Sequence, residues 1–186
     1  MKRTFCWMAA GLGLAALLSN GCVLTSAQIL VHYDLWNPVT IVANTDWGRL
    51  AVDLNTEDDY AKHKDKLKGL TDLAILGKFT NLSGPAGNVT VYIDAGTTTR
   101  TTLADITTNS TMLWGPVSIG ASGTTAATLD IGWNDSAKLF NAAGRKILIN
   151  QVKGTGLLTL YMVGSTGTYQ IKIERGKLIL VIEGGV

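Results

Sequence analysis

Few residues in this chain have the types and spacing that catalysis requires. The two histidines are His32, in an expected strand, and His63, on an expected charged helix. A triad built from His32, Asp34 and a distant serine has no local spacing to support it. Two histidines without ligand spacing also argue against a catalytic metal site. We therefore expect no enzyme, no metal and no cofactor, with a hydrolase that uses His32 and nearby carboxylates as an alternative.

Two short motifs approach known sites and then depart from them. The run from Asp53 to Asp58 begins like a calcium loop, but its sixth residue is Asp58 instead of glycine. The twelfth position counted from Asp53 is Lys64, where a calcium loop requires a glutamate. Around Ser122 the chain misses the GxSxG nucleophile motif by one position. An acidic helix start and a turn are the better interpretations, while loose calcium binding near Asp53 and Glu57 stays open.

Tryptophans offer the clearest candidate for ligand binding. Trp36 and Trp47 lie next to predicted loops, where flat aromatic side chains can stack on the apolar face of a sugar ring. The same size and flatness suit the core or rim of a sandwich, and packing is the competing interpretation. We name Trp36 and Trp47 as speculative ligand-binding residues.

The first residues form an export signal. Lys2 and Arg3 precede an apolar run over residues 5–18, and small residues follow before Cys22. The run is shorter than the roughly 20 residues of a spanning helix. No later segment is apolar enough to span a bilayer.

The end of this signal, Leu18-Ser19-Asn20-Gly21-Cys22, resembles the lipobox of bacterial lipoprotein precursors. Ser19 stands where that family usually has an apolar residue. The resemblance implies cleavage before Cys22, diacylglycerol on its sulfur and an acyl chain on its new amino group. Several acyl chains hold a protein stably on a membrane. Val23, rather than aspartate, resembles the outer-membrane pattern.

These signals divide the chain into a signal peptide (residues 1–21), a lipidated tether (22–27) and one domain (28–186). Cleavage after Ala27 is the alternative, and it would leave a periplasmic or secreted protein. Lys2 and Arg3 account for the net charge of +2, since the rest of the chain has 14 basic and 14 acidic residues. A neutral domain is not the footprint of a nucleic-acid binder. The four lysines at positions 62, 64, 66 and 68 are balanced by four acids within residues 57–68, as expected for a solvated helix.

Alternating apolar residues predict a chain made mostly of strands. The expected strands are residues 29–35, 39–43, 50–54, 70–80, 89–93, 112–119, 128–133, 158–163, 169–174 and 178–182. Helices are expected over 57–68, ending at Gly69, and from the caps at 134–136 to Gly154. Tight hairpin turns are expected at 164–167 and 174–177, and a turn is expected at 120–125 between two strands. The Thr-rich residues 95–110 suggest a loop with a brief turn near Leu103–Ile106. The sum favours a mainly β fold, an antiparallel, immunoglobulin-like β-sandwich with two helical connections.

The order of several segments resembles uncharacterised secreted or lipid-anchored β-sandwich proteins of Gram-negative bacteria. Those segments are Asp53-Leu54, 60–67, Thr80-Asn81, 113–116 and 152–154. The resemblance implies no established activity. We expect a non-enzymatic envelope lipoprotein that binds or supports another envelope component, a protein or a glycan. The alternatives are a carbohydrate-binding module and a subunit of a surface assembly.

Overall fold

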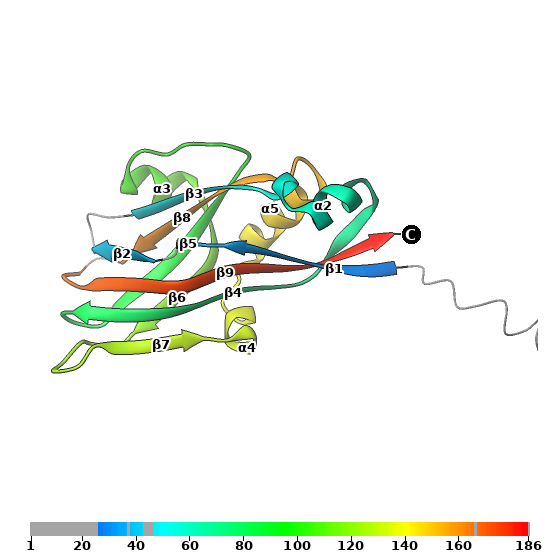
Figure 1. Ribbon diagram of the computed structural model, residues 1–186. Coiled ribbons are helices and arrows are strands. Elements are labelled where there is room, and N and C mark those ends of the chain that lie inside the picture. Colours follow the sequence, from blue (N-terminus) through cyan, green and yellow to red (C-terminus); the bar gives the residue numbers. More distant parts are fainter. Residues whose placement is uncertain (1–25, 37, 43–46, 166, 186) are drawn as a thin grey trace, which may run out of the picture.

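Two antiparallel sheets packed face to face form the domain in the computed structural model (Figure 1). The structure describes residues 26–36, 38–42, 47–165 and 167–185. The strands are β1 (Ser26–Asp34), β2 (Val39–Val42), β3 (Trp47–Asp53), β4 (Leu67–Ser83), β5 (Gly87–Ala95), β6 (Thr111–Ile119), β7 (Ala127–Ile131), β8 (Leu157–Gly164) and β9 (Gln170–Gly185). The helices are η1 (Leu54–Thr56), α2 (Asp58–His63), η2 (Lys64–Lys66), α3 (Leu103–Asn109), α4 (Trp133–Ala137) and α5 (Ala142–Lys153).

The strand order is that of a jelly roll. One sheet runs β1-β9-β4-β7, with β2 also paired to β9, and the other runs β3-β8-β5-β6. Among the described strands, only β5 and β6 are both consecutive in the chain and paired with each other. Most other connections cross from one sheet to the other, which is the connectivity of a jelly roll and not that of an immunoglobulin domain. The predicted antiparallel β-sandwich is confirmed.

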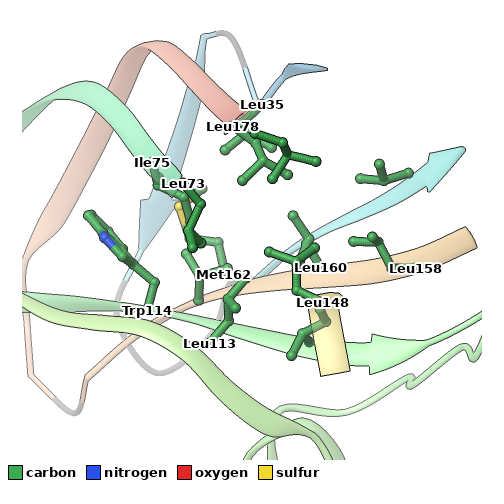
Figure 2. Close-up of a cluster of buried hydrophobic side chains, with 14 of the residues drawn as sticks. Leu35, Leu73, Ile75, Leu113, Trp114, Leu148, Leu158, Leu160, Met162 and Leu178 are labelled. Carbon is green, nitrogen blue, oxygen red and sulfur yellow. The ribbon is translucent and has the colours of Figure 1, made fainter. Parts of the chain in front are cut away.

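The core lies between the two sheets (Figure 2). Along β5, Val89, Val91 and Ile93 are fully buried and alternate with less buried residues, as expected for a strand with one face in the core. Figure 2 shows Leu160 and Met162 of β8 among the same buried side chains. Each such side chain contributes about 1.5–3 kcal/mol by leaving water.

The predicted hairpin at residues 174–177 is wrong, because β9 is one long strand. Arg175 has a φ of 57° and sits at a bulge, where the register against β4 shifts between Leu76 and Lys78. Both halves of β9 pair with β4 on one side, so they cannot pair with each other. On the other side they pair with β1 and β2, and the Leu35 amide donates to the Gly176 carbonyl across the bend.

Two other turns join strands of different sheets. The connection at 164–167 leads from β8 to β9, and the turn predicted at 120–125 leads from β6 to β7. Neither is a hairpin. Turn residues mark where a strand ends, but they do not fix which strand becomes its partner.

The helix predicted up to Gly154 is interrupted. After α4 the chain makes a bridge between Phe140 and Trp114 of β6, and α5 then starts anew with Asn141 as its cap. The Asn141 side chain accepts a hydrogen bond from the Ala143 amide at 2.9 Å. Pairing with the edge of β6 therefore overrides the helical spacing of Leu139 and Phe140.

The first predicted helix is also shorter than expected. It consists of η1, α2 and η2, and β4 begins at Leu67, so Gly69 lies inside a strand instead of ending a helix. Leu67 and Gly69 pair with Gly184 and Glu183 of β9. This pairing outweighs the favourable order of acids and lysines along the helix. Both helical connections remain, and α3 adds a third within the Thr-rich stretch.

Candidate binding site

Helix α3 covers part of the outer face of the four-stranded sheet. Ile106 of α3 is fully buried there against Tyr161 and Val163 of β8. Trp47, Tyr92 and Leu103 pack around this small cluster, which is separate from the main core. The outer face of a sandwich sheet is ordinarily solvent-exposed and polar. Here Tyr161 and Val163 are 0% and 5% exposed, because α3 packs over them.

A hollow of about 550 Å³ lies beside this cluster, between α3 and the sheet. Thr90 and Tyr92 of β5 and Val163, Gly164 and Ser165 at the end of β8 line one side. Leu103, Ala104 and Thr107 of α3 line the other side. The volume is in the range of small-molecule sites, roughly 300–1,000 Å³. We call this hollow the α3 pocket.

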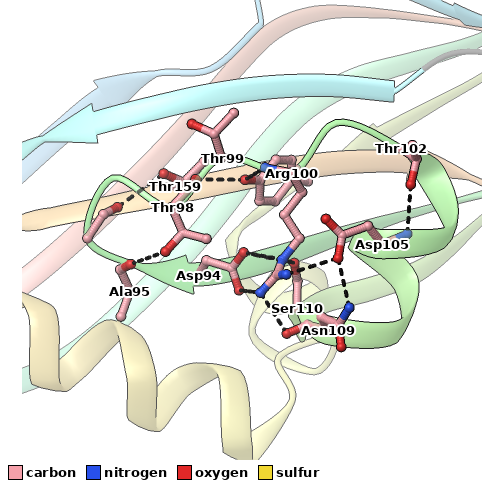
Figure 3. Close-up of polar contacts among 12 residues, drawn as sticks. Asp94, Ala95, Thr98, Thr99, Arg100, Thr102, Asp105, Asn109, Ser110 and Thr159 are labelled. Atoms are coloured by element: carbon pink, nitrogen blue, oxygen red, sulfur yellow. Dashed lines mark hydrogen bonds and ion pairs between the residues drawn. The ribbon is translucent and has the colours of Figure 1, made fainter.

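A single arginine holds α3 in place (Figure 3). The Arg100 Nε donates to Asp94 Oδ2 at 2.7 Å and to Ser110 Oγ at 2.9 Å, and Nη1 donates to Asp105 Oδ1 at 3.0 Å. The guanidinium therefore joins β5, the start of α3 and the residue that follows α3. We call Arg100, Asp94, Asp105 and Ser110 the α3 clamp.

The clamp shifts the protonation of its members in the direction expected for ion pairs. Hydrogen bonding to Asp94 raises the pKa of Arg100. The hydrogen bond from Asn109, followed by that from Arg100, lowers the pKa of Asp105 below its ordinary value of 3.8. Both shifts favour the charged forms that make the clamp.

The loop before α3 is also fixed to the sheet. The hydroxyl of Tyr161 donates to the Thr98 carbonyl at 2.8 Å and accepts from the Arg100 amide at 2.9 Å. Thr102 caps α3 by accepting a hydrogen bond from the Asp105 amide. The segment expected to be a loop is thus an ordered wall of the pocket.

The lowered pKa of Asp105 predicts an acid-sensitive clamp. A carboxylate whose pKa is depressed by folding contributes stability at pH values above 3.8, and that contribution is lost as the pH falls through the folded value. We expect Asp105→Asn to lower the melting temperature by a constant amount between pH 7 and pH 5. The difference from the wild type should shrink below pH 3.8. A difference that is unchanged down to pH 3 would contradict this assignment.

Trp47 lies at the rim of this surface. Its ring centroid is 5.9 Å from that of Tyr161, at an angle of 56°. It packs against the cluster that includes Val163, which also lines the α3 pocket. Of the two tryptophans selected from the sequence, Trp47 is the one that lies near the pocket.

Trp36 lies elsewhere, against the main core. Its indole faces the backbone of Gly48, where an added Cβ would lie 2.9 Å from the indole Nε1. That Nε1 is buried and has no hydrogen-bond partner in the described structure. Trp36 packs with the core between the sheets, and the structure does not combine Trp36 and Trp47 into one flat platform.

His32 borders a different hollow. Glu57, Asp58 and Asp59, at the start of α2, line the same hollow as this histidine of β1. Thr56 is the hydroxyl residue there, and its Oγ1 donates to the Asp53 carbonyl. No group of three potential metal ligands occurs among the described residues. Asp53 itself caps η1, accepting from the Asn55 amide.

Cys22 and the signal peptide lie outside the described residues. Within the described ranges, no helix has the length and apolar character needed to cross a membrane.

The clamp was missed in the sequence, although a signal for it is present. Arg100 is the one basic residue between Lys78 and Lys138, and Asp94 and Asp105 are the acids nearest to it in the chain. An isolated cation flanked by two acids within an uncharged stretch indicates a local ion-pair network. The aromatic outer face was missed because Tyr92 and Tyr161 alternate with apolar residues, as any strand residues do.

The comparisons with known proteins leave the family open. No protein-family model matches the chain, and no curated protein matches it. A solved structure from Desmodium yellow mottle tymovirus is 12% identical, covers 83% of this chain and 88% of its own, and has a TM-score of 0.23. One from turnip yellow mosaic virus is 10% identical over 84% and 80%, with a TM-score of 0.26. The structure of infectious bursal disease virus, Gx strain, is 9% identical over 87% and 36%, with a TM-score of 0.25. Scores this low carry no argument, so the site alone must suggest the function.

Proposed function

We propose that this protein is a non-enzymatic cell-envelope lipoprotein, anchored by lipid on Cys22, whose domain binds another envelope component at the α3 pocket. The observation that carries the binding role is the hollow of about 550 Å³ between α3 and the sheet, with α3 joined to β5 by the α3 clamp. The lipid anchor is supported by the residues before Cys22.

The position of the pocket relative to the anchor fits this role. Ser26 pairs with Gly185 at one end of β9, while the β8–β9 connection, which includes the pocket residue Ser165, lies at the other end (Figure 1). At about 3.3 Å per residue, β9 spans roughly 50 Å. With three residues between Cys22 and Ser26, the anchor holds the near end of the domain within about 14 Å of the lipid. The pocket would then face away from the membrane that holds the protein.

Cross-linking in cells tests the binding role. A photo-reactive residue at Ala104, in the pocket wall, is expected to capture one reproducible envelope component. The matched control is the same residue at Thr40, an exposed position on β2 in the other sheet, and it should not capture that component. Equal capture from both positions, or none from Ala104 together with normal envelope assembly in a deletion strain, would remove the proposal.

The second candidate is a carbohydrate-binding module in which Trp47, and not the core-packed Trp36, stacks on the sugar. The contact of Trp47 with Tyr161 at the rim of the pocket favours it. On a glycan array we expect Trp47→Ala to weaken sugar binding at least tenfold, the loss typical of a stacking aromatic worth more than about 1.4 kcal/mol. Trp36→Ala, which removes a core contact, should change binding much less. Equal binding by the wild type and Trp47→Ala would exclude the platform.

A further inference from the structure

We infer that the α3 pocket binds a single neutral sugar unit of an envelope glycan. The inference rests on the proposed binding function and names the chemical class of its ligand. The ligand would lie between α3 and the sheet, against residues that were not selected from the sequence, and not on a platform of tryptophans.

The polar groups of the pocket are hydroxyls. Thr90, Tyr92, Thr107 and Ser165 each present one, and no acid, lysine, arginine or histidine is among the lining residues. Hydroxyls both donate and accept hydrogen bonds, as the hydroxyls of a sugar do. A charged ligand would leave its charge without a partner, which is costly in a partly desolvated site. The lining therefore favours a neutral ligand with many hydroxyls.

Some of these hydroxyls keep capacity for a ligand. Thr107 Oγ1 donates to the carbonyls of Leu103 and Ala104 within its own helix, so its lone pairs remain able to accept. Within the described part of the chain, the hydroxyls of Thr90 and Tyr92 make no hydrogen bond to other residues. Both hydroxyls are open to solvent, so a ligand can replace the water that they contact.

Apolar groups complete the match to a sugar ring. The Tyr92 ring is half-buried in the outer face, and Leu103 and Val163 lie on the two sides of the hollow. The C–H face of a pyranose is apolar and packs on such side chains, while the ring edge carries the hydroxyls. A fatty acyl chain would match the apolar groups but would displace water from the hydroxyls of Thr90 and Tyr92 without replacing its hydrogen bonds.

The pocket is also prepared before any ligand arrives. The α3 clamp (Figure 3) and the hydrogen bonds of the Tyr161 hydroxyl fix α3, which carries Leu103, Ala104 and Thr107. A site that is already ordered loses less conformational entropy on binding, which matters most for weak contacts. The preformed wall thus suits a small, hydrated ligand.

Glycan binding by the full-length protein, purified in detergent, tests the inference. We expect binding to a subset of neutral glycans on an array and a dissociation constant measurable by calorimetry with the best one. Ala104→Trp, at an exposed position of the pocket wall, should fill the hollow and weaken binding at least tenfold. Tyr92→Phe, which keeps the ring and removes one hydroxyl, should weaken binding by a smaller factor.

The matched control is Thr108→Trp, which places the same side chain at an exposed position of α3 outside the pocket lining. It should bind like the wild type, with an unchanged melting temperature. Binding to fatty acids or anionic glycans alone, no glycan binding at all, or equal binding by Ala104→Trp and Thr108→Trp would each overturn the inference. Cellular capture from Ala104 of a protein instead of a glycan would keep the proposed function while rejecting the sugar.

Discussion

Replacing Arg100 with methionine is expected to release α3 from the sheet. The substitution keeps the aliphatic stem but removes the guanidinium, so Asp94, whose side chain is 9% exposed, loses its cation. Local opening then exposes the amides of α3, and we expect their hydrogen-exchange protection to fall at least tenfold. Because α3 forms one wall of the pocket, binding of any pocket ligand should weaken by a similar factor.

The control for Arg100→Met is Arg175→Met. Arg175 also pairs with an aspartate, Asp130, but the two side chains are 72% and 68% exposed. Exposed pairs contribute little, so this variant should leave the exchange of α3 unchanged. If both variants behave alike, or if α3 keeps its protection in Arg100→Met, the clamp does not hold the pocket wall.

Replacing Gly144 with alanine is expected to destabilise the domain by about 3 kcal/mol. A Cβ at this position would lie 2.3 Å from the Met112 carbonyl oxygen and 2.6 Å from the Leu113 Cα. These are backbone atoms of β6, so α5 must move away from the sheet and lose the packing of Leu148. Urea denaturation measures the change in the free energy of unfolding.

Helix propensity predicts the opposite sign for this substitution, which makes the test sharp. Replacing an exposed glycine in a helix with alanine ordinarily stabilises the protein by about 1 kcal/mol. The control, Ala143→Gly, lies at the exposed neighbouring position and should cost about 1 kcal/mol by propensity alone. A stabilised Gly144→Ala variant would show that α5 does not pack on the backbone of β6.

The sequence predicted the class of the fold because alternation is a local signal. Val89, Val91 and Ile93 alternate with polar residues, and their burial on one face of β5 follows directly. The wiring is not local. Residues 174–177 have the composition of a hairpin turn, yet the segments before and after them both pair with β4 as parts of one strand, β9. Partner choice depends on the whole sheet, so no window of residues contains it.

In the candidate site, too, residue types could be read from the sequence, whereas contacts between distant segments could not. Trp47 was selected for its residue type, and its place at the rim of the pocket is compatible with that selection. Trp36 was selected for the same reason and lies against Gly48, and it directly follows Leu35, which is buried. A glycine inside a helix ordinarily costs stability, whereas the missing side chain of Gly144 is what allows α5 to reach β6. Close approach between elements leaves no trace in residue spacing.

The jelly roll explains where a binding site can form in this chain. Its sheets bury one face each, and function resides in what is added to the other face. Here the addition is α3, which Arg100 joins to β5 by pairing with Asp94 of β5 and Asp105 of α3. The proposed envelope role depends on the proposed lipid anchor at Cys22.

The intact mass of the protein extracted from bacterial membranes is the most direct test of that anchor. We predict a chain that begins at Cys22 and carries the added mass of a diacylglyceryl group and one amide-linked acyl chain. Cys22→Ala should abolish the added mass and release the protein from the membrane fraction. An unmodified chain that begins at Gln28, after cleavage at Ala27, would contradict the account of a lipid-anchored envelope protein.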